Sequence, residues 1–269
     1  MTGAYDWQGR VGTNWAREWM RTDRSFAGLN AVLVARAAAL RPARVLDLGC
    51  GAGETAIAVA AQCLDAAICG IDLSSDLIDA AQARAGARVR FAVGDATRWE
   101  DAGFRPDLVL SRHGVMFFDD PVAAFVHIRG VAAPGARLLF SCFRDRAEND
   151  WAVETAAAVG AATPGDPHAP GPFAFADRAR VADILSRAGW RDVGFEAVDW
   201  DYVAGGGADP VADAVDFFGR IGPAGAALAR MEDDARADAI AALRGVAERN
   251  RHGDVVRFRA AAWIVTAQG

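Results

Sequence analysis

Short apolar runs alternate with helix-like stretches through the first half of the chain. The runs predict five strands, at residues 44–48, 67–71, 89–93, 107–110 and 137–143. Between them, apolar residues recur at helical spacing, which predicts helices at 54–62, 75–85 and 120–132. Strands that alternate with helices imply right-handed crossovers, so the pattern indicates an α/β fold with a mostly parallel sheet.

The segments outside this alternation carry different patterns. Residues 1–23 lack strand alternation and hold an aromatic cluster of Tyr5, Trp7, Trp15 and Trp19, after which a helix is predicted at 26–40. Beyond residue 143, spacing predicts helices at 177–188, from 209 onward and near 232–250, and strands at 195–203 and 255–267. We see neither an internal repeat nor a second complete core. We therefore expect a helical cap at 1–40 and one main domain at 41–269, with a helical lid inserted at about 205–250.

The basic residues exclude two kinds of chemistry. All 29 of them are arginines, because the sequence contains no lysine. A P-loop needs a lysine to reach the nucleotide phosphates, so this class of nucleotide site is excluded. Schiff-base and pyridoxal-phosphate chemistry also need a lysine amine, and they are excluded on the same ground.

Charge and cysteine usage indicate which partners to expect. The net charge is −6 and no arginine block stands apart from its acidic neighbours, so we expect no nucleic-acid partner. No run approaches the roughly 18 apolar residues of a membrane span, and residues 1–10 lack a signal-like apolar run, so we expect a cytoplasmic protein that does not bind membranes. The four cysteines show no metal-ligand spacing with the four histidines, which predicts free core thiols and no metal site. The oligomeric state is not indicated.

The strongest functional signal is the stretch from Val45 to Thr55. A buried strand there runs into a turn that contains Gly49, Gly51 and Gly53 and opens a helix. Glycines let the backbone approach a ligand closely, and the new helix presents unpaired N–H groups. Asp72 ends the next strand and places a carboxylate beside the same crevice, where it could accept hydrogen bonds from ribose hydroxyls.

The spacing of these residues discriminates between cofactors. A dinucleotide fingerprint counted from Gly49 requires a glycine at position 54, where the sequence has Glu54. The observed Asp-x-Gly-x-Gly-x-Gly, which begins at Asp47, resembles motif I of class I S-adenosylmethionine (SAM) dependent methyltransferases. Further blocks resemble the family in order and spacing across residues 40–143: Gly70–Ser74, Gly94–Ala96, Asp107–Ser111 and Pro134–Leu138.

The resemblance implies a fold and a cofactor. It implies a Rossmann-like, seven-stranded, mostly parallel sheet whose last strand is antiparallel, with helices on both faces and a helical cap. It also implies that SAM is the cofactor and S-adenosylhomocysteine the product. The methionine part of SAM would pack on the three glycines of the turn, Gly49, Gly51 and Gly53, while Asp47 orders the loop.

The same resemblance implies roles for residues at the other strand ends. Asp72 would bind the ribose hydroxyls and Leu73 would lie against the adenine. Asp95 would accept from the adenine amino group, and the Ala96 N–H would serve a ring nitrogen. Ser111 would lie at the cofactor with Arg112 next to it, where the methionine end and the methyl acceptor meet.

The acceptor side is indicated by residues outside these blocks. His113 leaves the fourth predicted strand at the crevice, so it is the candidate base or acceptor-orienting group, or else a residue that fills space over the cofactor. Trp15 and Trp19 could close the acceptor pocket or anchor the core. Four phenylalanines could line an apolar pocket with Arg112 nearby: Phe173, Phe175, Phe217 and Phe218. For the pair Phe217 and Phe218, packing within a helix is the alternative.

These residues favour transfer of a methyl group to a small organic molecule. The chain lacks the Asn-Pro-Pro-Tyr type motif of family members that methylate DNA bases or Asn/Gln side chains. Two alternatives stay open on sequence alone. One is an enzyme of the same fold that binds SAM but does other chemistry or has lost transfer activity. The other is a nicotinamide-dependent oxidoreductase, which Glu54 disfavours.

Overall fold

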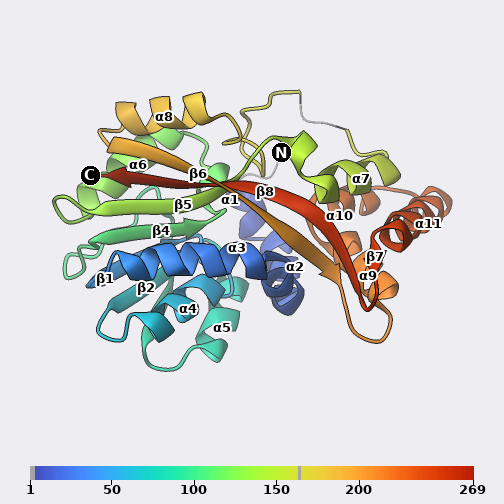
Figure 1. Ribbon diagram of the computed structural model, residues 1–269, viewed down its shortest axis with the longest axis horizontal. Coiled ribbons are helices and arrows are strands. Elements are labelled where there is room, and N and C mark those ends of the chain that lie inside the picture. The colour runs from blue at the N-terminus through green and yellow to red at the C-terminus, as the bar shows by residue number, and fades with distance from the viewer. Residues whose placement is uncertain (1–3, 163–164) are drawn as a thin grey trace.

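An eight-stranded sheet forms the centre of the molecule (Figure 1). The computed structural model describes residues 4–162 and 165–269. The strand order is β3-β2-β1-β4-β5-β8-β6, and β7 pairs with β8. The strands are β1 (Arg44–Leu48), β2 (Ala67–Asp72), β3 (Val89–Val93), β4 (Leu108–Arg112), β5 (Arg137–Phe143), β6 (Arg191–Gly205), β7 (Arg251–His252) and β8 (Val255–Gln268).

Strand direction confirms the predicted fold class. β1 to β5 pair in parallel, whereas β8 runs antiparallel to both β5 and β6. The seven predicted strands are all present, and the eighth, β7, has only two residues, which is too short to leave an alternation in the sequence. β1 and β5 are buried along nearly their whole length, as expected for strands that helices cover on both faces.

Helices cover the two faces of the sheet (Figure 1). α3 and α4 pack against each other, with α5 alongside β2 and β3, and α6 packs with α8 on the opposite face. Their bounds are α3 (Trp19–Ala39), α4 (Glu54–Gln62), α5 (Ser75–Arg84), α6 (Pro121–Val131) and α8 (Arg178–Arg187). Polar side chains fix two of the starts, because Ser74 accepts a hydrogen bond from the Leu77 N–H and Asp120 accepts one from the Ala123 N–H.

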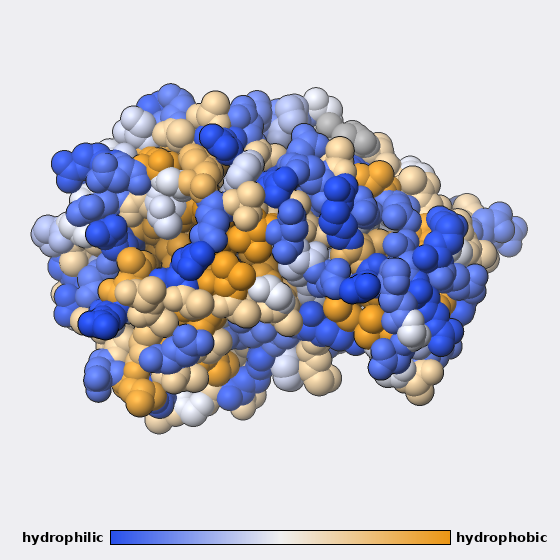
Figure 2. Space-filling model, in the orientation of Figure 1, coloured by the Kyte–Doolittle hydropathy of each residue, from blue (hydrophilic) through white to orange (hydrophobic). Residues whose placement is uncertain are grey.

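The long strands β6 and β8 extend beyond the rest of the sheet (Figure 1). Three helices lie between them in the chain, and we call these the cap helices, as distinct from the helical segment predicted at residues 1–40. The cap helices are α9 (Pro210–Arg220), α10 (Gly222–Leu228) and α11 (Asp233–Arg249). Helix α7 (Asp150–Ala158) packs against α10 and α11. Figure 2 shows mostly hydrophilic residues over the end formed by α11 and β7, whereas hydrophobic residues gather toward the middle of this face.

The chain before α3 is helical and lies over the sheet end where β1 and β2 finish. It forms α1 (Ala4–Trp7) and α2 (Arg10–Arg17), and α2 packs against α5. The Thr13 hydroxyl donates to Asp76, and Gly12 lies so close to Ser74 that a Cβ would come within 2.3 Å of its Oγ. Only glycine therefore allows this approach. No helix in the described residues is long and apolar enough to cross a membrane.

Candidate active site

A cavity of about 550 Å³ opens where β1, β2 and β4 end, the edge at which open α/β sheets bind ligands. Its volume lies in the range of roughly 300–1,000 Å³ that small-molecule sites occupy. One half is bounded by the glycine-rich turn after β1 and by the ends of β2 and β3. The other half is bounded by α3, α7 and the cap helices α9 and α10.

The glycine-rich turn presents its backbone to the first half of the cavity. Gly51 has φ +55° and nothing within 4 Å of the position where a Cβ would be, so this residue faces open space. Gly49 also lines the cavity. Gly53 instead faces the core, where a Cβ would come within 2.7 Å of the Phe91 ring. Two of the three predicted glycines thus line the cavity, and the third allows α4 to begin close to the sheet.

Asp72 stabilises the turn from the neighbouring strand. Its carboxylate accepts hydrogen bonds from the Gly51 N–H and the Ser74 N–H, both at 2.9 Å. The side chain is buried but lines the cavity, and burial raises its pKa. A carboxylate has about four lone-pair positions, so Asp72 keeps acceptor capacity for a ligand after both backbone bonds are made.

Asp47 is a buried carboxylate with an unused oxygen. It is 1% exposed, it lines the cavity, and its Oδ2 has no hydrogen-bond partner among the described residues. Burial raises the pKa of Asp47 to about 7, and the charge of Asp72 adds to this while Arg112 opposes it. A positively charged ligand group in the cavity would relieve the cost of this unpaired acceptor.

The residues predicted to hold adenine lie together at one end of the cavity. Leu73, Asp95 and Ala96 all line it. Asp95 accepts hydrogen bonds from the Thr97 N–H at 2.9 Å and hydroxyl at 2.7 Å, and the Arg98 guanidinium lies 2.9 Å away. These contacts lower the pKa of Asp95 although partial burial acts in the opposite direction, so the carboxylate remains ionised.

Arg112 lies between the two halves of the cavity and is already paired. Its guanidinium binds Glu54 and lies 3.9 Å from Asp23. Asp23 also pairs with Arg84, whose guanidinium stacks 3.8 Å from the centroid of the Trp19 ring. Trp19 and Arg112 both line the cavity, as predicted, but this ion-pair network was not apparent from the sequence.

His113 faces the second half of the cavity from a strained backbone position. Its φ is +63°, which is uncommon for a residue with a Cβ and often marks functional sites. Nδ1 lies 2.7 Å from the Ser141 Oγ, and Nε2 is buried without a hydrogen-bond partner among the described residues. Burial and the charge of Arg112 lower the pKa of His113 well below 6.5, so the imidazole is neutral.

Aromatic and apolar side chains wall the second half of the cavity. They come from α3, β5, α7, β6 and α9: Phe26, Phe143, Trp151, Tyr202 and Phe218. Three of their rings lie nearly parallel, with interplanar angles of 12° between Trp151 and Tyr202 and 11° between Tyr202 and Phe218. We call these five side chains the aromatic wall. Their elements are far apart in sequence, so only the fold brings them together.

Two phenylalanines predicted to line the pocket lie behind it. Phe217 is fully buried in the core and Phe218, its neighbour on α9, takes the lining position instead. Successive helical residues point about 100° apart, so only one of the pair can face the cavity. Phe173 packs against Phe143 and Trp151 from outside the cavity. Among the residues that the structure describes, neither Phe173 nor Phe217 lines the site.

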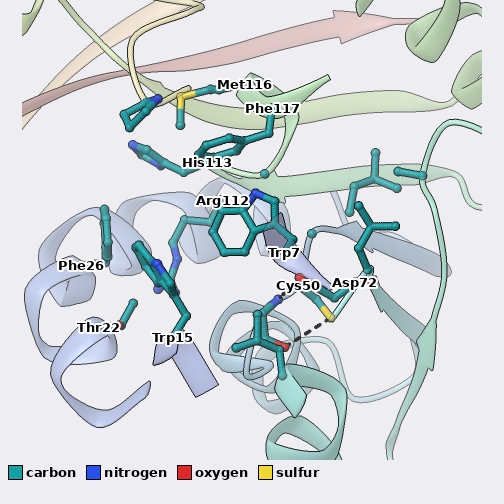
Figure 3. Close-up of a pocket in the computed structure, with 18 of the residues that line it drawn as sticks. Trp7, Trp15, Thr22, Phe26, Cys50, Asp72, Arg112, His113, Met116 and Phe117 are labelled. Carbon is teal, nitrogen blue, oxygen red and sulfur yellow. Dashed lines mark hydrogen bonds between the residues drawn. The ribbon is translucent and has the colours of Figure 1, made fainter. Parts of the chain in front are cut away.

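Two N-terminal tryptophans, Trp7 and Trp15, line the cavity (Figure 3). Trp7 lies between the aromatic half and the Cys50–Asp72 region, and its ring is 5.2 Å from Phe117 and 5.7 Å from Trp15. Trp15 lines the cavity, as predicted. The side chain of Tyr5, in the same predicted cluster, lies outside the described residues.

Ser111 supports the site without lining it. It is fully buried, donates to the Leu48 carbonyl at 2.8 Å and accepts from the Gly114 N–H at 3.2 Å. The hydroxyl thereby ties the end of β1 to the turn after β4. No group of His, Cys, Asp and Glu that could hold a metal ion occurs in the described part of the chain. The four cysteines are free, and burial raises the pKa of the Cys50 thiol at the cavity.

Comparison with known proteins decides the family. Residues 45–135 match a family described as a methyltransferase domain. The trans-aconitate 2-methyltransferase of Methylobacterium radiotolerans is 30% identical over 200 residues, which cover 69% of this chain and 76% of that relative. The chain belongs to the class I SAM-dependent methyltransferases. SAM is therefore the cofactor of this methyltransferase, and a nicotinamide-dependent oxidoreductase is set aside.

Further relatives agree with this assignment. The demethylmenaquinone methyltransferase of Deinococcus radiodurans is 34% identical over 42% of this methyltransferase and 48% of its own length. The solved structure of the YcgJ protein of Bacillus subtilis is similar at a TM-score of 0.53 and 16% identity, covering 88% of this chain and 98% of that protein. At such low identity this structural similarity shows the fold alone.

Proposed function

We propose that this methyltransferase transfers the methyl group of SAM to a small organic acceptor held against the aromatic wall, with His113 as the residue that orients it. The observation that carries the proposal is His113, which lines the cavity and whose buried Nε2 atom has no hydrogen-bond partner among the described residues. A buried ring nitrogen without a partner costs free energy unless a ligand satisfies it.

The first half of the cavity fits the cofactor. Asp72 would accept from the ribose hydroxyls, Leu73, Asp95 and Ala96 would hold the adenine, and the open face of Gly51 would lie along the methionine part. The unpaired Oδ2 of Asp47 suits the positive charges of SAM. When bound, SAM supplies a methyl group on a positively charged sulfur, which is reactive enough that alignment provides most of the catalysis.

His113 would accept the proton that the acceptor hydroxyl loses when it is methylated. Because its pKa lies well below 6.5, the neutral ring has a lone pair to accept a hydrogen bond from a hydroxyl. Once the hydroxyl oxygen also carries a methyl group it bears a positive charge, and its remaining proton is strongly acidic. Even a weak base can then take that proton. The Ser141 hydroxyl would accept from Nδ1–H and so keep the lone pair on Nε2, toward the acceptor.

A small acceptor also agrees with the enclosure of the site. The aromatic wall is built from buried side chains, and α1, α2, α9 and α10 each contribute residues that line the cavity. We infer that α1, α2 and the cap helices act as a lid on the main domain. The relative from Methylobacterium radiotolerans is named for a small-molecule acceptor, trans-aconitate, which supports the same size class.

The test is a transfer assay with three kinds of acceptor. The protein is incubated with methyl-labelled SAM and, separately, with small hydroxylated compounds, with a mixture of proteins and with RNA. We expect label in small molecules and matched formation of S-adenosylhomocysteine. Label in protein or RNA alone would refute the small-acceptor proposal. S-adenosylhomocysteine formed without any methylated product would instead support the alternative of other chemistry on the same fold.

A further inference from the structure

We infer that the methyl acceptor is an uncharged aromatic ring compound with a hydroxyl group, and not a polycarboxylate. This inference rests on the proposed function and narrows its substrate class. It is carried by three features of the cavity: the sign of its charges, the aromatic wall, and the number of polar atoms left without partners.

The charges of the cavity oppose an anionic acceptor. Among the described residues that line it, six are aspartates, Asp23, Asp47, Asp72, Asp95, Asp119 and Asp120, and Arg112 is the one arginine. That guanidinium already binds Glu54 and has Asp23 nearby. His113 adds no positive charge because its low pKa keeps it neutral. Three of these aspartates, Asp47, Asp72 and Asp95, bound the proposed cofactor half. In the other half, a tricarboxylate would meet Asp23 and no unpaired cation among the described lining residues.

The aromatic wall favours a ring compound. Trp151, Tyr202 and Phe218 form a nearly parallel set along one side, and Phe143 lies in edge contact with the His113 ring at 4.1 Å. Aromatic faces and edges stabilise a further ring beyond the apolar area that it buries. The Tyr202 hydroxyl is bonded to Ser25, and burial raises its pKa to about 12, so Tyr202 offers the cavity a ring and no charge.

Few polar atoms in this half are free to bind an acceptor. The Thr155 hydroxyl donates to the Trp151 carbonyl. Four cavity residues have a buried side-chain atom without a partner among the described residues: Trp7 Nε1, Thr22 Oγ1, Asp47 Oδ2 and His113 Nε2. Of these, Thr22 and His113 lie on either side of Phe26 in the aromatic half (Figure 3). One hydroxyl on the acceptor would satisfy His113, whereas three carboxylates would need many more donors than the cavity provides.

The experiment measures binding to the protein saturated with S-adenosylhomocysteine, so that chemistry cannot interfere. 2-Naphthol serves as the uncharged ring probe and trans-aconitate as the polycarboxylate probe, both by calorimetry. We expect 2-naphthol to bind at least about tenfold more tightly than trans-aconitate. Tighter binding of trans-aconitate, or its methylation by the SAM-loaded enzyme, would overturn the inference while leaving the small-acceptor function intact.

Two adjacent residues of α9 provide matched variants. Phe218→Leu removes a ring of the aromatic wall, and Phe217→Leu removes a ring that faces the core. We expect Phe218→Leu to weaken 2-naphthol binding about three- to tenfold with little change in S-adenosylhomocysteine affinity, and Phe217→Leu to leave both affinities near wild type. Equal effects of the two variants, or no binding of 2-naphthol to the wild type, would refute an aromatic acceptor. Transfer to protein or RNA alone would refute the proposed function as well.

Discussion

The Nδ1 atom of His113 lies 2.7 Å from the Oγ atom of Ser141, which comes from the neighbouring strand β5. This contact holds a ring that lines the cavity, and Nε2 is left as the ring nitrogen without a partner among the described residues. The backbone at His113 adopts φ +63° to allow it, and the His113 N–H donates to the Ser141 carbonyl at 3.1 Å. Two bonds between the same pair of residues therefore hold a strained residue at the acceptor half of the site.

Replacing the imidazole should separate chemistry from packing. His113→Phe keeps an aromatic ring among Phe26, Phe143 and Trp200 but removes the nitrogen. We expect methyl transfer to a hydroxylated acceptor to slow by roughly 10²–10⁴-fold, with SAM affinity nearly unchanged. His127→Phe is the control, because His127 bonds to the Trp99 carbonyl outside the cavity. Wild-type turnover in His113→Phe would reject the role of His113 without rejecting the enzyme class.

The pH dependence should reflect a histidine that is hard to protonate. The pKa of His113 is lowered well below 6.5 in the folded protein, so the unfolded chain binds more protons in the window between that value and about 6.5. The contribution of His113 to stability is therefore present above pH 6.5 and is lost as pH falls through this window. We also expect the acid limb of kcat/KM to lie well below pH 6.5 and to be absent in His113→Phe. A limb centred near 6.5 that survives in this variant would contradict the assignment.

Asp72 should contribute a measurable part of cofactor affinity. Asp72→Ala removes a charged acceptor from the proposed ribose site and also the two hydrogen bonds to Gly51 and Ser74. We expect SAM binding to weaken by about 1.5–3 kcal/mol in calorimetry on the folded variant. Asp95→Ala should cost less, because Asp95 is more exposed to solvent. Unchanged affinity in folded Asp72→Ala would refute the assigned site.

Asp47 should lower the stability of the cofactor-free protein and raise its affinity for SAM. The pKa of Asp47 is about 7 in the folded protein and about 4 in an unfolded chain. Between these two pH values the folded state holds a proton that the unfolded chain has released. The free energy of unfolding therefore falls as pH rises from about 4 to 7 and then levels off. Asp47→Asn keeps an acceptor and removes this cost. We expect the cofactor-free variant to gain about 1–4 kcal/mol in unfolding free energy at pH 8, with no gain at pH 4, and to bind SAM more weakly. Equal stability at pH 8 together with unchanged SAM affinity would contradict this role.

Removal of the N-terminal segment tests the proposed lid. Deleting residues 1–17 removes α1, α2, Trp7 and Trp15 but keeps Glu18, which pairs with Arg21 and Arg220. We expect turnover to be abolished while cofactor binding survives in part, because the glycine turn and Asp72 remain. Circular dichroism confirms that the truncated protein is folded. Normal turnover in a folded truncation would show that these residues are no lid.

The first half of the fold and the proposed cofactor site could be predicted from the sequence, because each strand and each turn there has its own local sequence pattern. Each strand of the first half has its own apolar run, and the predicted strands agree with β1 to β5 within two residues. The turn from Gly49 to Gly53 and the carboxylate of Asp72 follow strands directly. Residues at strand ends in a parallel sheet meet at one edge, so spacing alone was enough to bring them together.

The acceptor half could not be predicted in the same way. α7 is short and rich in alanine, so its apolar face left no clear period, and Trp151 was missed with it. Phe143 and Tyr202 read as ordinary strand residues, because nothing local shows that their ends of β5 and β6 border a cavity. The choice between Phe217 and Phe218 depends on how α9 rotates against its neighbours, which is set by tertiary packing.

The fate of the methyl group tests the central claim most directly. Wild-type protein is incubated with methyl-labelled SAM and 2-naphthol, and S-adenosylhomocysteine and labelled product are quantified together, with His113→Phe run in parallel. We predict that the wild type forms the two products in equal amounts, with the label on the naphthol oxygen, and that His113→Phe forms them at least about a hundredfold more slowly. Label found only on trans-aconitate, protein or RNA, or equal rates for the two proteins, would contradict the account.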